Sequence, residues 1–281
     1  MSLLRNDTAH QGVACKDVTV ASCTGKNGTI AIWDVNSCTQ TENFTGHTAT
    51  VTSLQILNGN RIVSGSADKT LKLWDQKTRT CIGTFEGHKK AVTSVFAIGD
   101  IIVSGSADNT VKLWDLSTGT CIETLKGHTD AVTSVFAVGN IIVSGSSDKT
   151  VKIWDQRTHT CTQTLEGHTN AVTTISGTDD IIVTGSKDLT VNVWCPYTLQ
   201  SMVTLKAPDY VYNVCASGSK ILVSVDHVFN VYNYRYMSDK KAMTVLMCIY
   251  RFASRFPNEM IQLIFEFLGF KYTGEHSFVI C

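Results

Sequence analysis

Histidine, aspartate and serine recur together along the chain, and these three residue types can form a hydrolytic triad. Four Gly-His pairs are each followed by an aspartate, which gives the sets His47 and Asp68, His88 and Asp108, His128 and Asp148, and His168 and Asp188. A hydrolase assembles its nucleophile, base and orienting acid once. Because this constellation occurs four times with almost the same spacing, 21, 20, 20 and 20 residues from histidine to aspartate, we expect it to be architectural and not catalytic.

The same period governs a second pair of residues. Trp-Asp pairs begin at Trp33, Trp74, Trp114 and Trp154, spaced by 41, 40 and 40 residues, and Trp194 follows after another 40. Residues 88–127 and 128–167 are identical at 27 of 40 positions. The chain is therefore an array of repeats of about forty residues.

One repeat contains four short β segments. In the third repeat they are Ala91–Ala97, Ile101–Ser106, Thr110–Trp114 and Cys121–Leu125, each rich in Val, Ile, Thr or aromatic residues and bounded by turn residues. A single four-stranded sheet cannot bury both its faces, so neighbouring sheets must stack. Stacking around an axis gives a β-propeller.

The repeats end near Trp33, Trp74, Trp114, Trp154, Trp194 and Tyr232. We expect residues 1–236 to form an all-β propeller of about six four-stranded blades. The first and last repeats are atypical, because Ala9 replaces glycine before His10 and Ala207-Pro208 replaces Gly-His. The outer strand of the last blade could come from residues 2–4 or from residues 241–246.

On its Gly-His and Trp-Asp pairs, the chain resembles the WD-repeat propellers over roughly residues 8–235. The resemblance implies that the histidine, the aspartate, a strand Ser or Thr and the tryptophan of each blade form a hydrogen-bonded chain. The residues matched to it are His47, Asp68, Trp74, His88, Asp108, Trp114, His128, Asp148, Trp154, His168, Asp188 and Trp194. In the third repeat the hydroxyl belongs to Ser104 or Ser106, which share one strand parity.

The resemblance also indicates a face for partner binding. In related ubiquitin-ligase propellers, arginines at two loop positions of each blade bind the phosphates of a substrate. Here these positions hold Thr52, Thr93, Thr133, Thr173 and Tyr212 at one place, and Lys26, Ala67, Ala107, Ser147 and Lys187 at the other. We therefore expect a neutral face lined by hydroxyls, which suits an uncharged extended peptide and disfavours a phosphorylated one.

Residues 237–281 differ in composition from the repeats, and we expect a short α-helical tail. Residues 243–252 fit either a helix or a strand, and a clearer helical pattern follows from Pro257. Residues 256–268 resemble the start of an F-box, a motif that docks on a ubiquitin-ligase adaptor. The residues matched to this docking role are Phe256, Pro257, Glu259, Ile261, Ile264 and Leu268.

Composition removes several classes of function. Basic and acidic residues number 24 each, which disfavours binding to nucleic acid or an anionic membrane. No stretch reaches 18 apolar residues, and residues 1–10 lack a signal-peptide pattern, so we expect a cytoplasmic protein, with the nucleus as the alternative. The ten cysteines show no zinc-ligand spacing, and we expect Cys81, Cys121 and Cys161 to be buried in strands without disulfides.

The sequence thus predicts a non-catalytic scaffold for protein partners, with no cofactor and no metal. Its more specific form, which depends on the tail, is a substrate-recruiting subunit of a ubiquitin ligase. The alternative is a targeting propeller for a separate kinase or another signalling complex, with a purely structural tail. An enzyme is disfavoured, because no phosphate loop, metal site or single acid–base pair is present.

Overall fold

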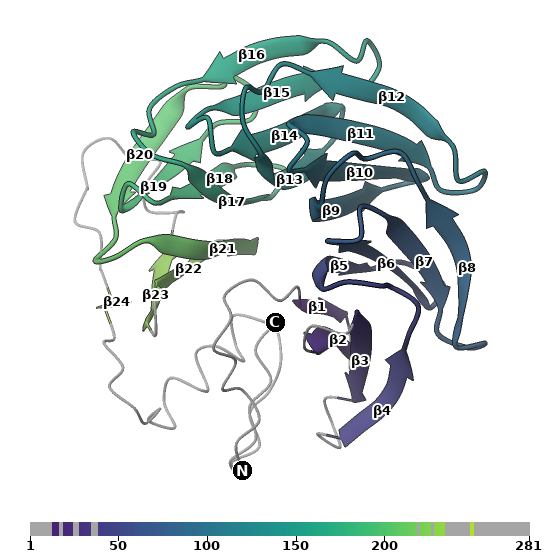
Figure 1. Ribbon diagram of the computed structural model, residues 1–281. Helices are drawn as coiled ribbons and strands as arrows, with labels where there is room; N and C mark the ends of the chain where they lie inside the picture. Colours follow the sequence, from purple (N-terminus) through teal and green to yellow (C-terminus); the bar gives the residue numbers. More distant parts are fainter. Residues whose placement is uncertain are drawn as a thin grey trace. The chain divides into compact units, whose positions relative to one another are not determined.

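The computed structural model describes residues 13–16, 19–24, 28–34, 39–217, 220–225, 228–233 and 248–249. Within these ranges the strands form six four-stranded sheets, each with its strands in sequence order (Figure 1). This part of the chain contains no helix, and so none that is long and apolar enough to span a membrane. The expected all-β repeats of four-stranded sheets, consistent with a β-propeller, are confirmed.

The described strands fall into two compact units that divide near β12. The first unit holds three sheets. Their strands are β1 (Val13–Lys16), β2 (Thr19–Thr24), β3 (Thr29–Asp34) and β4 (Thr39–Phe44), then β5 (Val51–Ile56), β6 (Arg61–Ser66), β7 (Leu71–Asp75) and β8 (Thr80–Phe85), then β9 (Val92–Ile98), β10 (Ile101–Ser106), β11 (Thr110–Asp115) and β12 (Cys121–Lys126).

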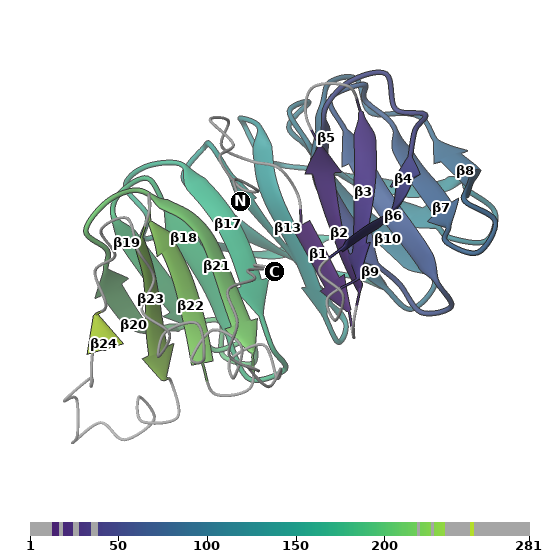
Figure 2. The same cartoon turned by 90° about the horizontal axis from the view of Figure 1, so that it is seen from below.

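The second unit holds the other three sheets. Figure 2 shows three strands of the last sheet, β21, β22 and β23, side by side. Their strands are β13 (Val132–Val138), β14 (Ile141–Ser146), β15 (Val151–Asp155) and β16 (Cys161–Leu165), then β17 (Val172–Gly177), β18 (Ile182–Ser186), β19 (Thr190–Trp194) and β20 (Ser201–Lys206), then β21 (Val211–Ser217), β22 (Lys220–Val225), β23 (Val228–Asn233) and β24 (Cys248–Ile249).

The position of a strand in its sheet decides how deeply it is buried. The second strand of a sheet, such as β14, is buried at five of six residues, which its continuous run of apolar and small residues permits. The fourth strand, such as β16, is exposed over most of its length because it forms the outer edge of the sheet. The two-residue turn between β13 and β14 places Gly139 at φ 56°, a region that favours glycine.

Neighbouring sheets within a unit pack through their first and second strands. In the first unit β5 and β6 lie against β9, where Val63, Leu71, Val92 and Ile102 are fully buried in one apolar cluster. Gly65 on β6 lets these strands approach closely, because a Cβ there would lie only 2.6 Å from Cγ1 of Val92. The core therefore lies between sheets.

The last sheet differs from the others at its outer edge. Its fourth strand, β24, has two residues and pairs Cys248 with Val231 and Ile249 with Asn230. Residues 248–249 lie within the segment 243–252, so at these positions the strand alternative applies. The segments 2–4 and 241–246 lie outside the described residues, as does the rest of the expected helical tail. The number of blades stays a prediction.

Candidate functional site

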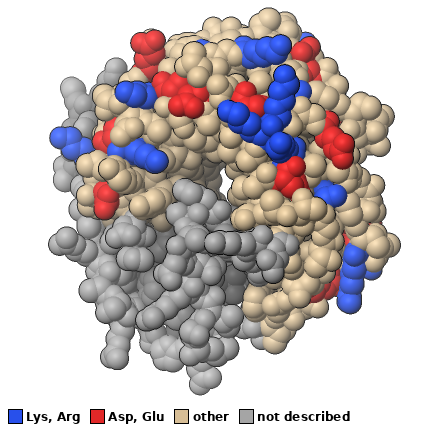
Figure 3. All heavy atoms as spheres, viewed as in Figure 1, with Lys and Arg blue, Asp and Glu red and all other residues tan. Residues whose placement is uncertain are grey.

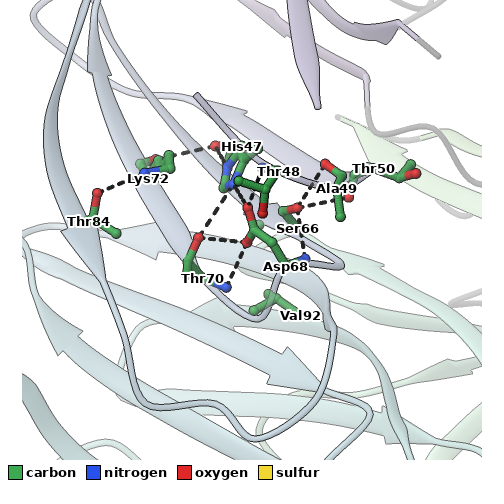
Figure 4. A network of polar contacts seen from close by, with 12 residues as sticks. His47, Thr48, Ala49, Thr50, Ser66, Asp68, Thr70, Lys72, Thr84 and Val92 are labelled. Carbon is green, nitrogen blue, oxygen red and sulfur yellow. Dashed lines mark hydrogen bonds and ion pairs between the residues drawn. The ribbon is translucent and has the colours of Figure 1, made fainter. Parts of the chain in front are cut away.

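The residues that could do hydrolytic chemistry meet in the β5–β8 sheet. Nδ1 of His47 lies 2.7 Å from Oδ2 of Asp68 (Figure 4). Nε2 of the same ring lies 2.7 Å from the hydroxyl of Ser64. The indole nitrogen of Trp74 lies 2.8 Å from that hydroxyl. The Thr70 hydroxyl donates to Oδ1 of Asp68 at 2.7 Å. Five side chains thus form one continuous polar chain.

The same arrangement recurs in three further sheets. The His–Asp distances are 2.9 Å for His88 and Asp108, 2.8 Å for His128 and Asp148, and 2.9 Å for His168 and Asp188. The strand hydroxyls that bridge histidine to tryptophan come from Ser104, Ser144 and Thr184. The structure therefore brings together the twelve matched His, Asp and Trp residues as four networks.

The structure also decides between Ser104 and Ser106. Ser104 lies between the ring of His88 and the indole of Trp114. Ser106 instead donates to the carbonyl of Ala91 at 2.9 Å and accepts from the backbone N–H of Asp108 at 3.1 Å. Ser104 is therefore the bridging residue, and Ser106 holds the turn that carries the aspartate.

The direction of each hydrogen bond follows from the groups involved. An ionised carboxylate only accepts, so Nδ1 of His47 carries the proton and donates to Asp68. Burial lowers the pKa of His47, although the hydrogen bond and the charge of Asp68 raise it. The ring is therefore neutral, and its Nε2 accepts the proton of the Ser64 hydroxyl, whose oxygen accepts the indole N–H of Trp74. Each of the hydrogen-bonding groups of His47, Ser64 and Trp74 in this network therefore has a partner.

Burial would by itself raise the pKa of the Asp68 carboxyl group. Hydrogen bonds from the Thr70 hydroxyl, from His47 and from the backbone N–H groups of Thr70 and Thr48 reverse this effect and lower the pKa to about 2. The pKa of Asp148 is also about 2, for corresponding reasons. These carboxylates are ionised near neutral pH and orient their histidines.

This geometry is poorly suited to nucleophilic attack. The Ser64 hydroxyl and the indole of Trp74 are almost completely inaccessible to solvent, so a substrate cannot reach the oxygen. The oxygen already accepts the tryptophan N–H, and its proton is already shared with histidine. The arrangement instead fixes a loop and two strands to one another.

The first and last sheets depart from the pattern. His10, Lys26 and Asp226 lie outside the described residues. In the last sheet Tyr232 occupies the tryptophan position and is 3% exposed, and Pro208 stands where the histidine would be. Oδ1 of Asn230 is buried and has no hydrogen-bond partner among the described residues.

Five residues of the expected partner face occupy equivalent positions in five sheets. Thr52, Thr93, Thr133, Thr173 and Tyr212 are each the extra residue of a β-bulge in the first strand of a sheet. A bulge re-aims its side chain, and the hydroxyl of Thr133 lies 2.7 Å from the carbonyl oxygen of Val172 in the next sheet and 3.0 Å from that of Gly145 in its own. This hydroxyl is committed to the protein itself.

Two more of these threonines bond in the same way. The Thr52 hydroxyl lies 2.6 Å from the Val92 carbonyl oxygen, and the Thr173 hydroxyl lies 2.5 Å from that of Val211. Tyr212 is 37% exposed. The part of the face that a partner could touch is therefore smaller than the sequence indicates.

The second set of face residues lies in the turns that carry the network aspartates. Ala67, Ala107 and Ser147 are partly buried, and Lys187 is exposed. Their backbone N–H groups donate to the carbonyl of the residue immediately before the first strand, as Lys187 does to Ala171 at 3.0 Å. Among the described residues of the predicted face, Lys187 and Tyr212 present large exposed side chains.

The prediction that three cysteines are buried is wrong. Cys81, Cys121 and Cys161 are exposed and carry free thiols. They lie on β8, β12 and β16, which form the outer edges of their sheets and leave one face of the strand uncovered. The residue types and the bounding turns predicted the strand but not its place at the edge.

Sequence reasoning missed a groove in the first unit. It has a volume of about 350 Å³ and is lined by Arg61, Leu73, Ile82, Gly83, Thr84, Phe85, Leu116, Ser117, Thr118 and Gly119. We call it the β8 groove. The available signal was Gly83, a glycine in the middle of a strand, which can mark the close approach of a ligand or another backbone.

Charged side chains of both signs are interspersed on the face seen in Figure 3, as the balanced composition leads one to expect. Such a surface lacks the single-sign field that steers nucleic acids. The described residues contain no cluster of three His, Cys, Asp or Glu side chains that could hold a metal ion.

Comparisons with known proteins agree with this description. The sequence model "WD domain, G-beta repeat" matches residues 36–75, 79–115, 119–155 and 159–195. A crystal structure of the computationally designed Ika8 protein superposes with a TM-score of 0.71 and 32% sequence identity, covering 81% of this chain and 72% of that one. No curated protein sequence matches significantly.

Proposed function

Because the chain belongs to the WD-repeat family, whose domains generally bind protein partners, we propose that it is a non-catalytic interaction scaffold. The observation that carries the proposal is the repetition of one closed polar network in four sheets. A catalytic constellation would occur once and would face solvent. These networks are buried and internally satisfied, so they stiffen the loops that present surface residues.

Binding to partners would then depend on exposed side chains of the predicted face. Tyr212 and Lys187 support this proposal, because an exposed aromatic ring and a flexible cation are unusual among the mostly small residues of the predicted face. Aromatic side chains contribute strongly to protein interfaces. We place the partner on the turn between β18 and β19 that carries Lys187 and on the bulge of β21 that carries Tyr212.

The experiment is a crosslinked purification of the tagged full-length chain from its native cells, followed by quantitative mass spectrometry. Tyr212→Ala and Lys187→Glu should each reduce recovery of a stoichiometric partner at least about fivefold. Tyr197→Ala is the matched control, because Tyr197 is 79% exposed in a different loop. A chain recovered without any stoichiometric protein would overturn the scaffold proposal.

A more specific proposal concerns the tail. We propose that residues 256–268 dock on a ubiquitin-ligase adaptor, on the strength of the Pro-x-Glu pattern and the apolar residues that follow. In the same purification, Glu259→Lys and Ile264→Asp should remove a ligase adaptor and leave other partners in place. Glu266→Lys is the control for charge. Unchanged recovery of the adaptor, or its absence from the wild-type sample, would reject the ligase role alone.

A further inference from the structure

Three departures from the repeat meet at the β8 groove. Arg61 stands where three other sheets carry isoleucine, at Ile101, Ile141 and Ile181, whereas the register places Thr19 in the first sheet and Lys220 in the last at this position. Gly83 stands where the corresponding strands carry Glu123, Gln163 and Val203. Leu116 stands where other repeats carry Gln76, Gln156 and Pro196. All three line one groove although they lie up to 55 residues apart in the sequence.

Gly83 keeps the groove open. It lies opposite Leu73 in the register of β7 and β8, and its backbone adopts no positive φ. A Cβ at Gly83 would meet only Cβ of Leu73 at 3.6 Å and Cε2 of Phe85 at 3.8 Å, which are ordinary contacts. Packing therefore does not require glycine here, and a larger side chain would fill the groove.

Arg61 supplies an uncompensated positive charge. Its side chain is partly buried, and its guanidinium makes no hydrogen bond or ion pair with any described residue. Its cross-strand neighbour Asp75 instead accepts the backbone N–H groups of Lys77 and Thr78. A partly buried guanidinium without a partner in the described residues favours a carboxylate ligand, with which it can form two parallel hydrogen bonds.

The other lining residues indicate which kind of side chain would lie next to that carboxylate in a ligand. Ile82 is 51% exposed beside the buried side chains of Leu73 and Leu116, so apolar contact is available. The wall hydroxyls of Ser117 and Thr118 already donate to Asp115. Thr84 on the rim accepts from the ammonium group of Lys72 at 3.0 Å, which places a second cation nearby.

We propose that the β8 groove binds a peptide segment of a protein partner in which an acidic side chain lies next to an apolar one. The carboxylate pairs with Arg61, and the apolar side chain packs on Ile82 and Leu116 in the space that Gly83 leaves open. This inference deepens the proposed scaffold function and rests on it. The groove is distinct from the β21 bulge that carries Tyr212 and from the turn that carries Lys187.

The test is a selection of phage-displayed random heptapeptides on the full-length chain, followed by fluorescence anisotropy with the selected peptides. We expect an Asp or Glu within two positions of Leu, Ile or Met in these peptides. Arg61→Ile and Gly83→Gln should each weaken binding at least about tenfold. Both variants introduce the residue that a sister repeat carries at that position, so both should fold.

Matched controls keep the outcome specific. Lys77→Gln removes an exposed cation outside the groove lining, and Gln163→Ala changes the position that corresponds to Gly83 in another sheet; each should change affinity less than about twofold. Selected peptides that lack an acidic residue, or that bind both groove variants like the wild type, would overturn the groove proposal, as would a failure to select any peptide. Peptides that instead lose affinity with Tyr212→Ala would overturn it and leave the scaffold function standing.

Discussion

The indole N–H of Trp114 donates a hydrogen bond of 2.8 Å to the hydroxyl of Ser104. The same hydroxyl lies 2.7 Å from Nε2 of His88, and it is fully buried. One oxygen therefore satisfies a donor on one side and an acceptor on the other. Removing it leaves two buried polar groups without partners.

Ser104→Ala should lower the free energy of unfolding by about 2–4 kcal/mol, because an unsatisfied buried polar group costs about 1–3 kcal/mol. Urea denaturation followed by tryptophan fluorescence measures this loss. Ser104→Thr is the matched variant, because Thr184 makes the same two contacts in the β17–β20 sheet. It should cost about 1 kcal/mol or less. Equal losses in the two variants would show that the hydroxyl is not the stabilising group.

Acidification below pH 6.5 should destabilise the fold. Burial lowers the pKa values of His47, His88, His128 and His168 from 6.5, so below that pH the unfolded chain binds more protons than the folded one. The free energy of unfolding should fall by at least about 1 kcal/mol between pH 7.5 and pH 5.0. Urea denaturation at a series of pH values tests this, and a flat profile would contradict the assigned neutral rings.

A second decline should appear in stronger acid. The pKa of Asp68 and of Asp148 is about 2 in the folded chain, below the ordinary value of 3.8. The stability that these carboxylates contribute is complete above pH 4 and is lost as the pH falls toward 2. Far-ultraviolet circular dichroism during acid titration should show unfolding in this window. Asp68→Asn should remove part of the dependence, and an unchanged acid midpoint would contradict the role of this carboxylate.

The period of the sequence could predict much of the fold, because the same residue types must meet again in every repeat. The sequence could not choose between Ser104 and Ser106, since residues two apart in a strand point to the same face of the sheet. The structure separates them at the bulge of Thr93 in β9, opposite Gly105 and Ser106, where the Ser106 hydroxyl donates to the carbonyl of Ala91. A local backbone irregularity of this kind has no residue signature that distinguishes the two serines.

The β8 groove could not be predicted for a different reason. Arg61, Gly83 and Leu116 each look like ordinary variation within a repeat, and only their meeting in space gives them a joint meaning. The exposure of Cys81 was missed because residue types and bounding turns identify a strand without showing which neighbour covers it. Sequence periodicity thus predicts the repeated elements better than it predicts features that one repeat has alone.

Any side chain at Gly65 on β6 should lower the stability of the fold. A Cβ there would lie 2.6 Å from Cγ1 of Val92 and 2.8 Å from Cγ1 of Val95, both fully or nearly fully buried. Gly65→Ala should lower the free energy of unfolding by about 1–3 kcal/mol, as expected for overpacking. Gly83→Ala is the control, because its nearest contact would be 3.6 Å. Equal effects would contradict the close approach, and a double-mutant cycle with Val92→Ala should show favourable coupling of at least about 0.5 kcal/mol.

The cysteines should differ in their rates of alkylation in the native protein. Cys195 replaces the aspartate of the Trp-Asp pair, and hydrogen bonds from the Thr198 hydroxyl and from the backbone N–H groups of Thr198 and Tyr197 lower its pKa. Burial raises the pKa of Cys215. With iodoacetamide at pH 7.5, peptide mass spectrometry should find Cys195 modified first, the exposed Cys81 next and Cys215 last, because the thiolate is the reacting species.

The variant Thr198→Val tests the cause of that order. It removes the hydroxyl hydrogen bond to Cys195 while keeping the shape of the turn, so alkylation of Cys195 should slow severalfold and that of Cys81 should not change. Unfolding in urea should abolish the differences, because every thiol then has the same surroundings. Rapid alkylation of Cys215 in the native protein would contradict its burial, and an unchanged rate at Cys195 would show that the Thr198 hydroxyl does not stabilise its thiolate.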